Sequence, residues 1–176
     1  KSFGTMVSDK ALGFTWAINS RQNKLTPWYG DTASDNRGEM LLWKYNGVLY
    51  DIIALSSAVF LPDKAQWKTE IKGVHFTVTV SVPERGMTKK ISVEAVNKSG
   101  HPREGELAFY TLPVLGVSRD ERSSFLAEKT SRGAVISNGT SESPGYMSLE
   151  FNLGADFVCF SRPDFFGARW AEDNEI

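Results

Sequence analysis

The sequence predicts an all-β fold, and three observations support that prediction. Some nine or ten short apolar runs follow one another with turn residues between them, which is typical of a β-sandwich. Residues 74–82 alternate apolar and polar side chains over nine positions, the period of a strand with one buried face. No segment shows a convincing helical repeat of apolar residues. We therefore expect a sandwich of packed sheets.

The first part of the chain contains a strong hairpin signal. One weak strand is expected at residues 5–8. Residues 40–44 and 48–55 then flank a turn that contains Asn46 and Gly47. An Asn-Gly pair between two apolar runs is the strongest short-range sign of a β-hairpin. We expect two antiparallel strands joined at this turn.

The most regular strand comes next. It is preceded by a strand that starts near Trp67 and turns at residues 71–73. In residues 74–82 the apolar positions share one face, so Val78 is expected to point into the core and Thr79 away from it.

Later strands are predicted from shorter patterns. Residues 89–96 place apolar side chains at alternate positions, and residues 106–115 form a longer apolar run that we expect to be buried on both sides. Residues 125–128 fit either a short helix or a strand. Three further strands are expected, at residues 134–137, 146–151 and 157–160.

A long polar stretch, residues 13–39, interrupts this series of strands. It sets Trp16 and Trp28 among charged, amide and glycine residues without any hydrophobic period, so a solvated loop is expected. Pro27 fixes one backbone dihedral and the glycines allow sharp bends, so the loop can hold one shape. Such loops on a β scaffold often carry binding groups. The pattern fits equally well an Ω-loop whose polar groups satisfy only one another.

The same stretch carries a family resemblance. Residues 19–28 read Asn-Ser-Arg-x-Asn-x-Leu-Thr-Pro-Trp, and Asp31 and Ser-Asp-Asn-Arg-Gly-Glu at 34–39 follow. This run resembles the N-terminal signature of glycoside hydrolase family 94. That family contains the cellobiose and chitobiose phosphorylases, the β-1,2-oligoglucan phosphorylases and the phosphorylase-like module of cyclic β-1,2-glucan synthases. The likeness covers about residues 4–167, is closest to the β-1,2-glucan branch, and includes later motifs at residues 80–83, 96–100 and 111–119.

The resemblance implies a specific fold and a non-catalytic role. The expected fold is a galactose-mutarotase-like super-sandwich of antiparallel sheets, here a single domain over residues 1–176. It is somewhat shorter than is usual in the family, which leaves room for fewer outer strands. In the family, the catalytic Asp and the phosphate-binding groups belong to a following (α/α)₆ domain. The chain alone is then non-catalytic, whereas the parent enzyme is an inverting phosphorylase that uses inorganic phosphate as co-substrate and no cofactor.

The resemblance also implies partners and candidate site residues. The expected roles are support of a homodimer and shaping of a cleft for a β-glucan oligosaccharide, with a loop reaching the partner subunit's sugar site. The matching material is residues 118–132 and 19–28. A free-standing carbohydrate-binding module and a purely structural packing domain remain as alternatives. The candidate substrate-binding residues are Arg21, Asn23, Lys24, Trp28, Asp31 and Arg119.

The two tryptophans of the stretch are interpreted differently. The Trp28 ring offers a flat apolar face to sugar C–H groups and an N–H to a hydroxyl. Burial of this ring to pin the loop is an equally good explanation. For Trp16 we favour the pinning role.

Composition and charge exclude several functions. The chain is 41% hydrophobic and 23% charged, as in an ordinary globular protein, and its net charge of −1 gives no electrostatic basis for binding nucleic acid. It has no signal peptide and no apolar run of about 18 residues, so we expect no membrane segment and a cytoplasmic location. Cys159 is expected to be an inert core thiol. The sequence lacks an initiator Met, and we expect a segment of a longer protein.

No metal site or catalytic residue is predicted. His75 and His101 lie 26 positions apart without a Cys or carboxylate at ligand spacing, which disfavours zinc. Asp31, Asp35 and Glu39 raise the alternatives of a calcium loop or a glycosidase pair. Their spacing of four would align them on one helix, but Gly38 and the lack of apolar partners argue against a helix. Capping, turn formation and solvation explain these three carboxylates better.

Overall fold

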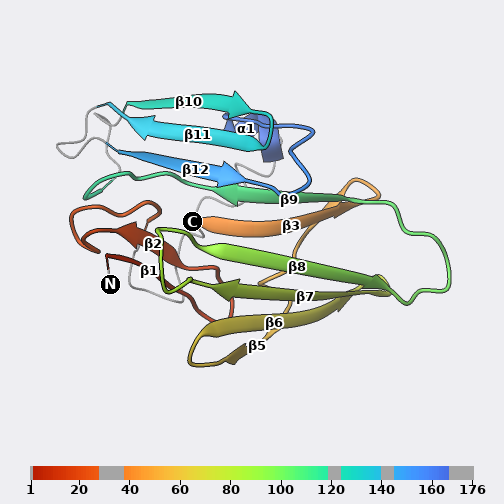
Figure 1. Ribbon diagram of the computed structural model, residues 1–176. Coiled ribbons are helices and arrows are strands. Elements are labelled where there is room, and N and C mark those ends of the chain that lie inside the picture. Colours follow the sequence, from red (N-terminus) through yellow and green to blue (C-terminus); the bar gives the residue numbers. More distant parts are fainter. Residues whose placement is uncertain (1, 28–37, 119–123, 140–144, 167–176) are drawn as a thin grey trace.

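The computed structural model describes residues 2–27, 38–118, 124–139 and 145–166 (Figure 1). Within these ranges twelve strands form four antiparallel sheets, and one short helix, α1 (Arg162–Phe166), follows the last strand. The predicted all-β fold of antiparallel sheets is confirmed. No helix in the part of the chain so described is long and apolar enough to cross a bilayer.

The largest sheet contains the strand that the sequence predicted best. It runs in the order β5 (Ser57–Phe60), β6 (Lys64–Ile71), β7 (Val74–Ser81) and β8 (Lys90–Asn97). In β7 every second residue is buried and the intervening ones are half-buried, as the alternation predicted. The edge strand β5 was not predicted. It is short and largely exposed, so its sequence carries no clear alternation.

The predicted hairpin supplies two strands of a second sheet, with the order β4 (Val48–Asp51), β3 (Glu39–Tyr45) and β9 (Glu106–Thr111), in which β3 is central. Asn46 and Gly47 have φ values of 50° and 77°, the left-handed pair of a type I′ turn. The predicted strand 48–55 is too long, because the Asp51 side chain accepts hydrogen bonds from the N–H groups of Ile53 and Ala54 and starts a turn.

The expectation for residues 106–115 was also wrong in two respects. The strand ends at Thr111, and its residues are exposed or half-buried, not buried on both sides. Among the described strands it lies at the edge of its sheet with β3 as its one hydrogen-bonded neighbour, and its side chains border the two apolar clusters without being enclosed by them. The strand buried on both faces is β3 itself.

A third sheet follows with the order β10 (Phe125–Thr130), β11 (Gly133–Asn138) and β12 (Tyr146–Glu150). Residues 125–128 are therefore a strand. The strand expected at residues 157–160 is absent: this segment is irregular and leads into α1. Phe157 and Phe160 are 74% and 55% exposed, so the apolar run is not a core strand, and Cys159 is only half-buried.

The fourth sheet pairs β1 (Phe3–Met6) with β2 (Phe14–Ala17). The first strand begins two residues earlier than expected. The second lies inside the stretch that was expected to be loop throughout. Its pattern escaped notice because Phe14 and Thr15 are both buried, so that apolar and polar positions do not alternate.

The core is organised around β3. Leu41 and Trp43 on one face pack into the cluster that includes Trp67 and Val78 of the four-stranded sheet. Met40 and Leu42 on the other face pack with Phe166 of α1. Successive β3 side chains therefore reach two different apolar layers, and the strand holds the sheet between them.

Two substitutions in β7 test this register. Val78 is fully buried and Thr79 is half-buried on the opposite face. Val78→Asp should prevent folding or cost several kcal/mol, because it buries an unpaired charge. Thr79→Asp should change the free energy of unfolding by less than about 1 kcal/mol. Urea denaturation of both variants measures the difference, and equal losses would contradict the register.

Candidate functional site

The loop after β2 is built on a local turn at Asn19. The Asn19 carboxamide oxygen accepts hydrogen bonds from the N–H groups of Arg21 at 2.8 Å and Gln22 at 3.0 Å, and its carbonyl accepts from Asn23 N–H at 2.9 Å. This is the turn that Asn side chains favour. It holds the backbone of Arg21 in place while the residue itself is exposed.

The loop begins with a strained residue. Ile18 has φ 64°, and its side chain is 71% exposed. A β-branched residue in the left-handed region is a genuine outlier and costs roughly 1–2 kcal/mol. Burial of this side chain within the described chain does not offset that cost.

Lys24 joins this loop to a distant segment. Its N–H donates to the Gly116 carbonyl at 2.9 Å, and Gly116 N–H donates back to the Lys24 carbonyl at 3.1 Å. Lys24 also forms a bridge with Trp16, so it lies between β2 and residue 116 as a short added strand. The Lys24 ammonium donates to the Val117 carbonyl at 3.0 Å. Residues 19–27 of the first candidate segment and residues 116–118 are therefore neighbours, and residue 118 is the first residue of the second candidate segment, 118–132.

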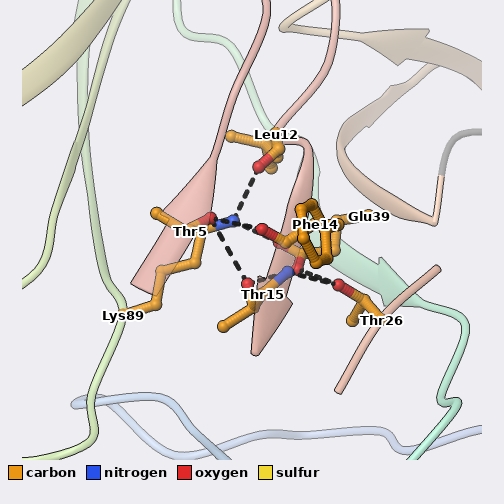
Figure 2. A network of polar contacts seen from close by, with 7 residues as sticks. All are labelled: Thr5, Leu12, Phe14, Thr15, Thr26, Glu39 and Lys89. Carbon is orange, nitrogen blue, oxygen red and sulfur yellow. Dashed lines mark hydrogen bonds and ion pairs between the residues drawn. The ribbon is translucent and has the colours of Figure 1, made fainter. Parts of the chain in front are cut away.

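A buried ion pair between Glu39 and Lys89 holds the same loop through Thr26 (Figure 2). Glu39 Oε2 lies 2.6 Å from the Lys89 ammonium, and both side chains are more than nine-tenths buried. The second oxygen, Oε1, accepts hydrogen bonds from the hydroxyls of Thr15 and Thr26, each at 2.9 Å. The ammonium donates in addition to the Leu12 carbonyl at 2.7 Å. Both charges are thus surrounded by partners.

The expectation for Glu39 was wrong in one respect. It was grouped with Asp31 and Asp35 as a capping, turn-forming or solvated carboxylate, but it is 4% exposed and paired with a cation. Asp31 and Asp35 lie outside the described residues. Among the residues that are described, no three His, Cys, Asp or Glu side chains gather as a metal site would require.

The structure describes three of the six candidate binding residues. Arg21 is exposed, whereas Asn23 and Lys24 are half-buried. The Asn23 carbonyl accepts a hydrogen bond from Ala17 N–H, and the Lys24 ammonium is engaged with a carbonyl, so these two residues have structural partners. Arg21 keeps its guanidinium in solvent. The other three candidates, Trp28, Asp31 and Arg119, lie outside the described residues.

The Trp16 ring packs within the β1–β2 sheet, and its expected role of pinning the loop stays a prediction. Trp16 is half-buried, and its ring stacks on Phe14 with centroids 5.0 Å apart. It also covers Gly4 so closely that a Cβ at position 4 would lie 2.3 Å from the ring. The β1–β2 sheet therefore needs both Gly4 and the Trp16 ring.

Sequence reasoning missed two features of this region. Lys89 was assigned only to the start of a strand, and nothing in its neighbours distinguishes it from an exposed lysine. The packing of the candidate segment 118–132 was missed as well: its second half, where a short helix or a strand was expected at residues 125–128, is β10, whose Phe125 and Ala127 pack against the cluster that contains Leu115.

A shallow hollow lies apart from the candidate loop. Its volume is about 230 Å³. It is lined by Ser2, Phe3, Pro83, Glu84, Gly86 and Met87. None of the candidate residues belongs to this lining.

Comparison with protein families gives one match. The glycosyl hydrolase 94 supersandwich domain matches residues 1–168. None of the curated proteins searched matches the chain.

The buried ion pair predicts a large and selective stability effect. Glu39→Ala would leave the Lys89 ammonium buried without its counter-charge and two threonine hydroxyls without their acceptor. We expect the free energy of unfolding to fall by about 3–5 kcal/mol in denaturant titrations.

Glu106→Ala is the matched control. Glu106 pairs with Lys44 at 3.3 Å, but the two side chains are 75% and 46% exposed. Removing this exposed pair should cost no more than about 1 kcal/mol. Similar losses in the two variants would show that the Glu39 pair does not hold the loop.

Proposed function

Because this chain belongs to the glycosyl hydrolase 94 supersandwich domain family, we propose that it is the non-catalytic N-terminal part of a family 94 glucan phosphorylase or cyclic glucan synthase-like enzyme. In this role it packs against a following (α/α)₆ catalytic domain, supports a homodimer and shapes the cleft that receives a β-glucan oligosaccharide. Inorganic phosphate is the co-substrate of the parent enzyme. A cytoplasmic location stays a prediction.

One observation carries the part of the proposal that concerns the sugar. The Lys24–Gly116 bridge brings residues 19–27 beside residues 116–118, at the start of the second loop that family resemblance relates to the sugar site. Residues 19–27 and 116–118, far apart in sequence, thus form one rim, a favourable arrangement for groups that contact an extended ligand. Arg21 contributes exposed hydrogen-bond donors to this rim.

Exposed apolar residues support the packing role. Leu55, Val59, Phe60 and Leu61 gather on and around the edge strand β5, each between 45% and 55% exposed. Among described residues, β5 pairs only with β6, so its outer edge keeps unpaired backbone groups. Apolar edges of this kind are usually covered in assembled proteins. Contact with a catalytic domain or a second subunit would cover this one.

The first test of the proposal is the absence of catalysis. The chain by itself should release no glucose 1-phosphate from β-1,2- or β-1,4-linked glucooligosaccharides in the presence of phosphate, because the proposed acid and phosphate site belong to another domain. A coupled assay for glucose 1-phosphate measures this against a mock-purified control. Turnover above that control would refute the non-catalytic role.

Trp28 tests the sugar-facing role. In an enzyme that contains this domain and its catalytic partner, Trp28→Ala should weaken oligosaccharide binding by about 1–3 kcal/mol with little change in melting temperature, the loss expected for one stacking or hydrogen-bonding partner. Glycan titration and thermal melts measure the two quantities.

Trp16→Ala is the control for this experiment, because the Trp16 ring packs on Phe14 and over Gly4. It should lower stability by roughly 3–5 kcal/mol and reduce binding only with the folded fraction. If Trp28→Ala behaves like this control, Trp28 pins the loop and does not contact sugar. Binding by the isolated chain would instead favour a free-standing carbohydrate-binding module.

A further inference from the structure

The sequence contains two Asn-Gly pairs, and the structure gives them opposite environments. Asn46 and Gly47 form the exposed turn between β3 and β4. Asn138 and Gly139 lie at the end of β11, where Asn138 is 5% exposed. Asn-Gly is the dipeptide most prone to spontaneous loss of the side-chain amide, because glycine leaves its own backbone nitrogen free to approach the Asn side chain.

We propose that Asn46 is a site of spontaneous deamidation in this protein and that the fold protects Asn138. In this reaction the deprotonated backbone nitrogen of Gly47 attacks Asn46 Cγ, and ammonia leaves. The product is a five-membered succinimide. Water then opens either of its carbonyls to leave an aspartyl or an isoaspartyl residue at position 46. Water is the sole co-reactant.

The turn leaves the reacting groups accessible. A Cβ built on Gly47 meets nothing within 4 Å, so the space beside the Gly47 Cα is open. Across the described ranges, no acceptor engages the Gly47 N–H and no hydrogen bond restrains the Asn46 side chain. The turn contains only two residues, so a small local opening suffices to bring nitrogen and Cγ together.

In the second pair, both the Asn138 side chain and the Gly139 backbone nitrogen are held by hydrogen bonds. The Asn138 amide nitrogen is 3.4 Å from the carbonyl oxygens of Val114 and Leu115 and donates to both. The attacking group is occupied as well, because Gly139 N–H donates to the Ser124 carbonyl at 3.0 Å. Reaction at Asn138 therefore requires that the end of β11 first unfolds locally.

The product would change the hairpin in two ways. It adds one negative charge to a chain of net charge −1. In the isoaspartyl form it also inserts a methylene group into the backbone of a two-residue turn that requires a left-handed pair at Asn46 and Gly47. Glu39, with its buried pair, is at the opposite end of β3, so the loop network should persist.

Peptide mapping of the folded chain tests the proposal. After incubation at mildly alkaline pH, mass spectrometry should find aspartyl and isoaspartyl products in the Asn46 peptide at least about tenfold faster than in the Asn138 peptide, because only the latter reacts through an opened state. The rate at Asn46 should rise with pH, since the attacking nitrogen must lose its proton. Asn46→Gly keeps a turn compatible with positive φ, and it should remove most of the acidic charge variant seen by ion exchange.

The unfolded chain is the internal control. In denaturant the two peptides should react at similar rates, which shows that the fold causes the difference. The proposal is overturned if Asn138 reacts as fast as Asn46 in the folded chain. It is overturned equally if Asn46 stays intact in the folded chain under conditions in which both sites react in denaturant.

Discussion

The contact between Glu39 and Lys89 is the constraint on which the arrangement of the β1–β2 sheet and the loop after it depends. Glu39 is the first residue of β3, the strand whose two faces carry the two main apolar layers. Burying two charges is costly unless both are paired and their remaining hydrogen-bonding capacity is met. The hydroxyls of Thr15 and Thr26 meet it for the carboxylate, and the Leu12 carbonyl for the ammonium. Another path for residues 12–26 would leave the ion pair without these three hydrogen-bond partners.

This constraint changes the meaning of the sequence signature. Within the run that resembles family 94, Thr26 and Glu39 are buried and bonded to each other. Leu25 packs beneath the third sheet. Pro27 lies so close to Gly38 that a Cβ there would meet its ring at 2.6 Å. These five residues are required by the fold, so their presence identifies the family without identifying a ligand. The polar character of the stretch, which suggested a binding loop, derives in part from a buried network.

Features that depend on local sequence, such as the alternation of a strand or the residues of a turn, could be predicted. Features that depend on residues far apart in the chain, such as a buried ion pair or the order of the strands, could not. The alternation in β7 is visible because one of its faces meets the core and the other is polar. The hairpin turn was predictable because few residues other than Asn and Gly adopt two left-handed conformations in a row. By contrast, Glu39 and Lys89 are 50 positions apart, and neither residue type predicts burial. The edge position of β9 was equally hidden, because strand order follows from the packing of the whole chain.

Several residues at or next to the rim of residues 19–27 and 116–118 are outside the buried network and are exposed to solvent. Ile18 carries backbone strain and exposes 71% of its side chain, and Val117, on the other side of the Lys24 bridge, exposes 58%. Arg21 adds a solvated cation held on a rigid turn. Neither strain nor exposed apolar surface stabilises the chain on its own, and such features concentrate where proteins meet ligands or partners. A contact beyond this domain accounts for both features, as the proposed cleft requires. That contact would recover the stability lost at Ile18, so the fold and the proposed function favour the same loop conformation.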